Sequence, residues 1–276
     1  NLGNFNYKNI IRNDLSEISL YKQKEKIFLS NKINNIQSNY SLINKKVIVN
    51  NDINLCLSNQ SLLKIENSEF ISLNGNEIEI SGCGSKPGSI LIKNSIIDLD
   101  SLSISNLGKI NQPLNLLYSG LNIINSDVAV DSLILNSSIT EDAVNFIDSD
   151  VKIGEVKAEN ILSDAIDSDS SNLIIDKIIC KTVSNDCLDL SYSKAKIGLI
   201  EGFNIKDKAV SIGEASKVYI NDINVFESEV GLVAKDSSEV SVGSINLYLV
   251  KLPLATYIKK PELGSPTVNI KSIKSS

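Results

Sequence analysis

The sequence repeats Ala143-Val144-Asn145-Phe146 in altered form as Ala165-Ile166-Asp167, Cys187-Leu188-Asp189-Leu190, Ala209-Val210-Ser211-Ile212 and Gly231-Leu232-Val233-Ala234. Each copy has a small residue, then apolar and polar residues in alternation. The first residues stand at 143, 165, 187, 209 and 231, so every step is 22 residues. A fixed period of this length over five copies is typical of a solenoid, in which each repeat packs on its neighbours.

Two further apolar series accompany this motif through the repeats. One begins at Val151/Ile153 and the other at Val156/Ala158, and both return with nearly the same period. Each repeat therefore carries three short strands with alternating apolar residues, separated by Ser, Asp, Asn and Gly. Three such strands cannot bury a face alone, but stacked coils can, at about 4.8 Å per coil. The sequence predicts an all-β chain: a parallel β-helix with coils of about 22 residues, and the crossover rule favours a right-handed one.

The period also divides the chain. We expect the β-helix to cover residues 45–276, which gives about ten coils at 22 residues each. Residues 1–44 lack the period and are expected to form an N-terminal cap or linker, with Asp14 as the N-cap of a short helix. Near the other end, the two prolines of 257–266 forbid ladder pairing, so we expect a protruding loop there.

The composition excludes several classes of function. The chain has no His, Met or Trp, so it holds no Ser-His-Asp triad and no His-ligated metal. The net charge of −6 argues against nucleic-acid binding, and no apolar run is long enough for a membrane span. A chain without Met is expected to be a processed product or a piece of a longer protein with an upstream domain.

The four cysteines show no metal-binding spacing. Cys180 and Cys187 fall in columns of small, inward-facing residues, which favours space-filling in the core; a disulfide between them is the alternative. Four cysteines in 276 residues are too sparse for a disulfide scaffold.

Several stretches resemble a known family. They are SNDCLDLS at 184–191, KDKAVSIGE at 206–214, AKDSSEV at 234–240 and KKPELG at 259–264. Residues 122–270 resemble right-handed parallel β-helix regions of pectate-lyase-like architecture, in particular the modules attached to spore-coat-H-type kinase-like surface proteins. Residues 46–80 resemble the cap and first coils of such modules. The resemblance implies the fold and an extracellular or cell-envelope location, but no established activity.

Acidic residues gather on the central coils. Residues 140–190 hold twelve acidic residues against four lysines, a net of −8, so the rest of the chain is +2. If the apolar residues of the motif point inward, Asn145, Asp167 and Asp189 form one outward column, with Asp169 on the same face as Asp167. A second column lies at the entry turn. It consists of Asp142, Asp164 and Asp186.

Three interpretations of these columns remain open. They are a solvated ladder of turn-forming side chains, a Ca²⁺ site at Asp167 and Asp189, or an acid/base pair of the glycosidase type about 5 Å apart. If the site binds a ligand, we expect the carboxylates to contact it. These are Asp164, Asp167, Asp169, Asp186 and Asp189.

The favoured function is a non-catalytic surface or scaffold module that binds a glycan or a protein partner. The alternative is a polysaccharide-modifying enzyme, a Ca²⁺-dependent lyase or epimerase acting on uronate polymers. Its candidate residues are Lys208 as base and Tyr192 as proton donor, with Asp167 and Asp189 holding Ca²⁺. Lys208 is also placed to form an ordinary ion pair with Asp186. Aromatic residues make up 5% of the chain, and the sequence predicts no exposed aromatic row for stacking sugars.

Overall fold

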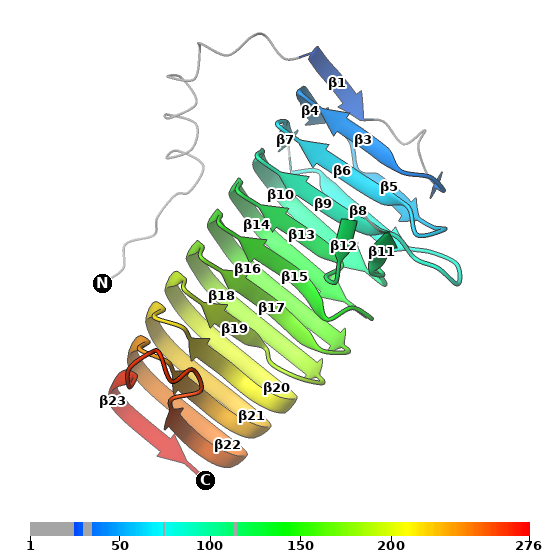
Figure 1. The fold of residues 1–276 in the computed structure, drawn as a ribbon. Helices are drawn as coiled ribbons and strands as arrows, with labels where there is room; N and C mark the ends of the chain where they lie inside the picture. Colours follow the sequence, from blue (N-terminus) through cyan, green and yellow to red (C-terminus); the bar gives the residue numbers. More distant parts are fainter. Residues whose placement is uncertain (1–24, 30–34, 74, 113–114) are drawn as a thin grey trace, which may run out of the picture.

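The chain folds into a parallel β-solenoid, in which strands of successive turns stack along one axis (Figure 1). The structure, a computed structural model, describes residues 25–29, 35–73, 75–112 and 115–276. The described residues contain strands and no helix. There are about nine turns, so the all-β repeat fold predicted from the sequence is confirmed. The right-handed sense stays a prediction.

Three faces run along the solenoid. The first face is built by β1 (Glu25–Leu29), β4 (Lys45–Val49), β7 (Glu69–Ser72), and the first parts of β10 (Ile96–Ser105), β14 (Asp127–Asn136), β16 (Asp150–Ile161), β18 (Asn172–Val183), β20 (Lys194–Gly213), β21 (Lys217–Lys235), β22 (Glu239–Tyr257) and β23 (Thr267–Ser275).

The second face continues from the same long strands. It consists of β2 (Asn35–Ile36), β5 (Ile53–Leu57), β8 (Glu77–Gly82) and the next parts of β10, β14, β16, β18, β20, β21, β22 and β23. The third face consists of β3 (Tyr40–Ile43), β6 (Leu62–Glu66), β9 (Ser89–Lys93), β13 (Leu121–Ile124), β15 (Asp142–Ile147), β17 (Asp164–Asp169), β19 (Leu188–Ser191) and the last parts of β20, β21 and β22. A small antiparallel pair, β11 (Ile110–Gln112) and β12 (Asn115–Leu117), lies beside this stack.

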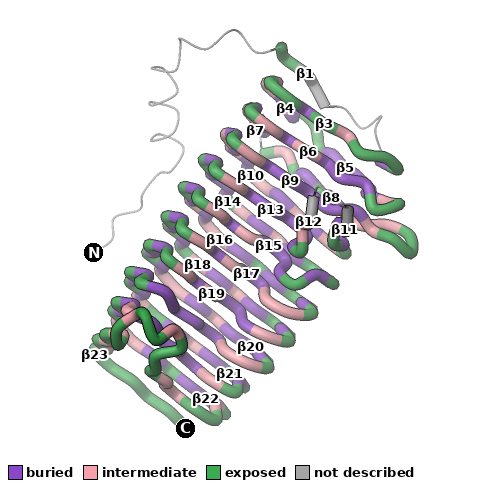
Figure 2. The backbone as a smooth tube through the Cα atoms, viewed as in Figure 1, coloured by how far each residue is buried: buried purple, intermediate pink, exposed green. Residues whose placement is uncertain are grey.

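The strand register reproduces the sequence period. Val144 pairs with Ile166, Ile166 with Leu188, Leu188 with Val210 and Val210 with Leu232. These five side chains are completely buried and form one continuous column in the core. Figure 2 shows buried residues alternating with more exposed ones along the strands. The inward direction predicted for the apolar positions of the motif is therefore confirmed.

A serine marks the corner between the third face and the following coil. Each of these serines follows a residue with positive φ, for example Tyr192 at 53° before Ser193, and each is buried. From Ser95 onward, the hydroxyl oxygen of each serine accepts the backbone N–H of the serine one coil earlier, at 3.0 to 3.2 Å. The resulting serine ladder satisfies backbone donors that the turn would otherwise leave unpaired. Its members are Ser68, Ser95, Ser126, Ser149, Ser171, Ser193 and Ser216.

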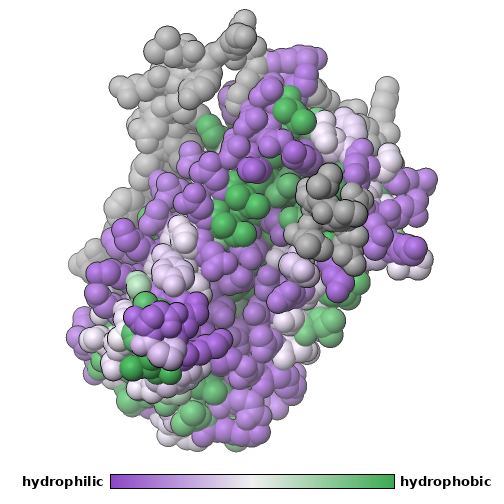
Figure 3. All heavy atoms as spheres, viewed as in Figure 1, coloured by the Kyte–Doolittle hydropathy of each residue, from purple (hydrophilic) through white to green (hydrophobic). Residues whose placement is uncertain are grey.

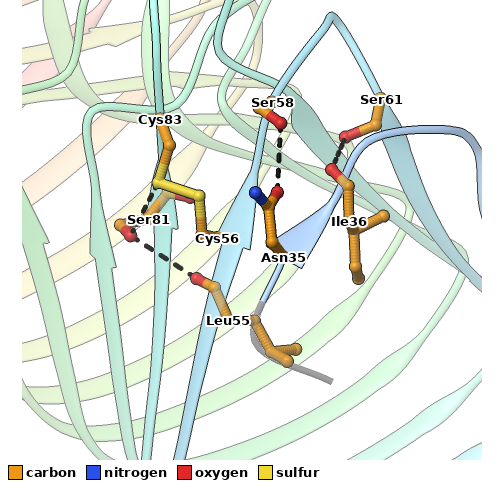
Figure 4. The surroundings of a disulfide bond; sticks show 8 residues. All are labelled: Asn35, Ile36, Leu55, Cys56, Ser58, Ser61, Ser81 and Cys83. Carbon is orange, nitrogen blue, oxygen red and sulfur yellow. Dashed lines mark hydrogen bonds between the residues drawn. A yellow bond between two sulfur atoms is a disulfide. The ribbon is translucent and has the colours of Figure 1, made fainter. Parts of the chain in front are cut away.

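All four cysteines form disulfides. Cys56 on β5 is joined to Cys83, which directly follows β8 on the next coil (Figure 4). Cys180 is joined to Cys187 across one corner of a single coil. Cys180 and Cys187 are buried as predicted, and the structure forms the disulfide that was the alternative to simple space-filling. Their columns hold small residues because the two sides of the coil come together there.

The loop at 258–266 does not protrude as predicted. It folds back over the C-terminal coils, where it is drawn in red in Figure 1. Asp236 Oδ1 accepts the backbone N–H groups of Lys259 and Lys260 at 2.6 and 2.8 Å. Gly264 and Ser237 exchange two hydrogen bonds, both of 2.7 Å. The prolines keep this segment out of the ladder, but three of its backbone N–H groups, those of Lys259, Lys260 and Gly264, bond side chains of the preceding coil. The helix predicted to begin at Asp14 lies outside the described residues.

Candidate functional site

The acidic residues lie in columns on the third face, as the sequence period predicted. The register pairs Asn145 with Asp167, Asp167 with Asp189, and Asp189 with Ser211. Asp142 pairs in the same way with Asp164 at the start of the strands. Successive coils thus place carboxylates at neighbouring positions on one face.

Most of these carboxylates have partners within the ladder itself. Asn145 Nδ2 donates to Asp167 Oδ2 at 3.0 Å. Asp164 Oδ1 accepts hydrogen bonds from Asn185 Nδ2 at 2.6 Å and from the backbone N–H of Asp186 at 2.8 Å. This is the behaviour expected of Asx side chains that stabilise their own turns.

Burial makes the columns unusual electrostatically. Burial, together with the nearby carboxylates of Asp142, Asp169 and Asp189, raises the pKa of Asp167 to about 8. Burial also raises the pKa of Asp142 to about 6, against the hydrogen bond from Ser119. The pKa of Asp164 is raised to about 6 for the same reason, against the hydrogen bond from the backbone of Asp186. With a pKa of about 8, Asp167 therefore holds its proton at neutral pH, whereas Asp142 and Asp164, with pKa values of about 6, are mostly ionised there.

The residues assigned to catalysis do not meet at one point. Lys208 Nζ lies 3.2 and 3.3 Å from the two oxygens of Asp186 and also contacts Asp207. Although burial opposes it, these carboxylates raise the pKa of Lys208, which keeps the amine protonated. The ion pair predicted between Lys208 and Asp186 is confirmed, and a protonated amine is a poor general base.

Tyr192 lies at the serine-ladder corner, where it is half exposed, and its ring lies beneath Lys260 Nζ, 5.7 Å from the ring centroid. Lys260 Nζ also lies 3.0 Å from Glu214 Oε1. The phenol is therefore part of the contact between the loop at 258–266 and the solenoid. Asp169 has its pKa raised by burial and by Asp189.

Lys235 is a buried residue of this face that sequence reasoning missed. It ends β21, and its Nζ lies 3.8 Å from Asp189 Oδ1. Its side chain passes over Gly213, where a Cβ would lie only 2.7 Å from Lys235 Cε. The signal was present in the sequence, since Gly213 and Lys235 are one period apart, but only the structure shows the side chain reaching back toward β19.

The first face carries a groove of about 470 Å³ across β18, β20, β21 and β22. Three lysines, Lys194, Lys196 and Lys217, line it together with Tyr219, which is 40% exposed. Lys217 pairs with Glu239 at 2.9 Å. Lys194 and Lys196 form no ion pair with other described residues, so both charges are available to a ligand.

The structure also corrects the prediction that no exposed aromatic row exists. Phe203, Phe226 and Tyr248 occupy equivalent positions on the second face of successive coils. The Phe203 and Phe226 rings are stacked, with centroids 5.3 Å apart, and the Phe226 and Tyr248 centroids are 5.9 Å apart. Because the phenylalanine rings stack face to face on each other, they present edges to solvent. Spacings of 23 and 22 residues are the sequence signal that could have revealed the row.

Hydrophilic side chains predominate over the face drawn in Figure 3, with separate apolar patches between them. Among the described residues, no group of three or more His, Cys, Asp or Glu side chains is arranged to hold a metal ion. That part of the chain also contains no helix long and apolar enough to cross a bilayer.

No protein-family model, no curated protein and no solved structure matches the chain.

Proposed function

We propose that the chain is a non-catalytic β-solenoid module that binds an acidic glycan along the groove of the first face. The observation that carries this proposal is the pair of unpartnered lysines, Lys194 and Lys196, beside the exposed ring of Tyr219. Lysine ammonium groups attract carboxylates or sulfates, and an exposed tyrosine offers an apolar face with a polar tip.

The geometry of the groove suits an extended polymer. Asn172, Lys194, Lys217 and Glu239 follow one another in register, as do Ile174, Lys196, Tyr219 and Ser241. Adjacent coils lie about 4.8 Å apart. A chain of sugars lying along the solenoid axis therefore meets polar side chains at each coil, and its acidic groups meet the two lysines.

The acidic columns have a structural role in this proposal. Asp164 and Asp186 are bonded to neighbouring coils, and Asp167 is held by Asn145. The alternative remains a Ca²⁺-dependent lyase or epimerase acting on uronates through Asp167, Asp189, Tyr192 and Lys208. It requires product formation, which a binding module does not give.

An extracellular or cell-envelope location belongs to the proposal. Its support is the pair of disulfides, because disulfides persist in oxidising compartments. The pectate-lyase-like type, and the association with spore-coat-H-type kinase-like proteins, rest on the resemblance of the sequence alone.

The test is a screen of the purified protein against neutral and acidic oligosaccharides, with Ca²⁺ or with a chelator. We expect salt-sensitive binding of acidic oligosaccharides under both conditions, without new reducing or unsaturated ends. The variant Lys194→Ala/Lys196→Ala should lose roughly tenfold or more in affinity per lysine, since a hydrogen bond to a charged group contributes about 1.5–3 kcal/mol.

The matched control is Lys157→Ala/Lys177→Ala, which removes two lysines from the second face. This variant should bind as the unmodified chain does. Ca²⁺-dependent product formation that is lost in Asp189→Ala would overturn the proposal in favour of the enzyme, and preference for neutral glycans would overturn the role of the lysines.

A further inference from the structure

Lys235 is the one buried lysine among the described residues, with a side chain only 7% exposed. Its stem packs over Gly213 instead of extending into solvent as lysine side chains usually do. It reaches past Gly213 to Asp189 Oδ1 at 3.8 Å, so it connects the end of β21 to β19 across the intervening coil of β20.

The contact lacks the hydrogen bonds of an ordinary buried ion pair. The distance of 3.8 Å is too long for a hydrogen bond, and Asp189 Oδ1 has no hydrogen-bond partner among the described residues. Ser211, opposite Asp189 on the next coil, is fully buried, and its Oγ is also unpartnered. By contrast, Lys208 bonds both oxygens of Asp186, and the backbone N–H of Lys208 adds a third bond at 3.0 Å.

The Asp189 side chain as a whole is 25% exposed, but its Oδ1 is buried and unpartnered. A largely buried charge pair without hydrogen bonds is costly, and loss of both charges would remove that cost. Buried nearby groups of either sign are few enough to name. Glu214 lies close enough for Lys235 to lower its pKa, but its carboxylate is bonded to Ser191 and Lys260. Asp236, next to Lys235 in the chain, is fully buried and its Oδ2 is also unpartnered. Among the described residues, however, only Asp189 has a carboxylate oxygen within 4.0 Å of the amine.

We propose that Lys235 and Asp189 become joined by an intramolecular isopeptide bond. A proton first passes from the ammonium group to the carboxylate, which gives a neutral amine and a neutral acid. Lys235 Nζ then attacks Asp189 Cγ, the C–N bond forms, and one C–O bond breaks. The oxygen leaves as water with two protons that came from the nitrogen. The step is balanced without any oxidant, reductant or cofactor, and it ties together the coils of β19 and β21.

The test is the intact mass of the reduced and denatured full chain after prolonged incubation at neutral pH. We expect a mass lower than that of the sequence by one water, and a protease digest in which the peptides of Lys235 and Asp189 are joined. Lys235→Arg keeps the positive charge but should show the full mass. A wild-type chain of full mass, with the two peptides separate, would overturn the proposal.

Two further variants assign the bond. Lys208→Arg alters the hydrogen-bonded pair at Asp186 and should retain the loss of one water. Gly213→Ala places a methyl group against Lys235 Cε and should block the reaction, whereas Gly202→Ala, whose nearest contact is 3.3 Å away, should permit it. Circular dichroism shows whether each variant is folded, and loss of water in Lys235→Arg would also contradict the assignment.

Discussion

At the residue scale, buried hydroxyl groups link one coil to the next. Ser193 accepts the N–H of Ser171 at 3.1 Å, while its hydroxyl lies 3.0 Å from Ser168 O and 2.9 Å from Ser191 O. Its own N–H donates to Ser216 Oγ at 3.0 Å. One small side chain thus satisfies backbone groups of two coils, and a residue without a hydroxyl would leave them unpaired.

Replacing Ser193 by Ala tests this role. The substitution leaves the buried N–H of Ser171 without an acceptor, which should lower the free energy of unfolding by about 1–3 kcal/mol. Urea denaturation of the variant measures the loss. The control is Ser85→Ala at an exposed bend, which should change stability by less than about 0.5 kcal/mol. Equal stability of the two variants would show that the serine ladder contributes nothing.

The buried carboxyls predict an inverted dependence of stability on pH. In the folded chain Asp167 holds its proton to about pH 8 and Asp186 to about pH 7, in both cases chiefly because of burial. An unfolded chain releases carboxyl protons near pH 4. Between these values the folded state binds more protons, so the free energy of unfolding should fall as pH rises, by up to about 1.4 kcal/mol per pH unit for each such carboxyl.

Urea denaturation from pH 4 to pH 8 measures this effect. Asp167→Asn, which cannot ionise, should flatten the dependence, whereas Asp222→Asn at an exposed position on the second face should leave it unchanged. A free energy of unfolding that rises through this range would contradict the assignment of protonated carboxyls.

At the element scale, the disulfide between Cys180 and Cys187 closes the corner between β18 and β19. Neighbouring coils hold Ala158 and Ala165 at the equivalent positions, so the corner can also be packed without sulfur. The bond is therefore an addition to a repeat that already folds, and its effect should be mainly on the unfolded chain.

The double variant Cys180→Ala/Cys187→Ala should fold but unfold at lower urea concentration. Closing so short a loop is worth about 2–3 kcal/mol in the chain-entropy account. Far-ultraviolet circular dichroism should stay unchanged, and the free energy of unfolding should fall by that amount. A variant that fails to fold at all would show that the two sulfurs are required to define the corner.

How much could be predicted differs between elements. Strands of the regular region, such as β17 and β19, were predictable because inward apolar positions repeat every 22 residues. The sequence predicts the position of the loop at 258–266 along the chain, but not that it folds back over the C-terminal coils. Its prolines predict that the strand ladder is interrupted there. Its attachment to Asp236 depends on hydrogen bonds that no local sequence pattern reveals.

At the scale of the whole molecule, the repeat determines which side chains share a face, but not which of them remain free. The period predicts that Asp167 and Asp189 lie at neighbouring positions on successive coils, and the structure confirms this. The period alone does not show that Lys194 and Lys196 are better placed for a ligand, because their columns on the first face repeat with the same spacing. What separates the two faces is burial and pairing, and these depend on side-chain contacts between coils that are visible only in three dimensions.

The central claim is that the first face binds an acidic glycan, and calorimetric titration tests it most directly. An acidic oligosaccharide is titrated into the unmodified chain and into Lys194→Ala/Lys196→Ala at low and high salt. The account predicts binding to the unmodified chain that weakens with salt, and a loss of roughly a hundredfold or more in the double variant, tenfold for each lysine. Equal affinity of the two proteins, or no binding by the unmodified chain, would contradict it.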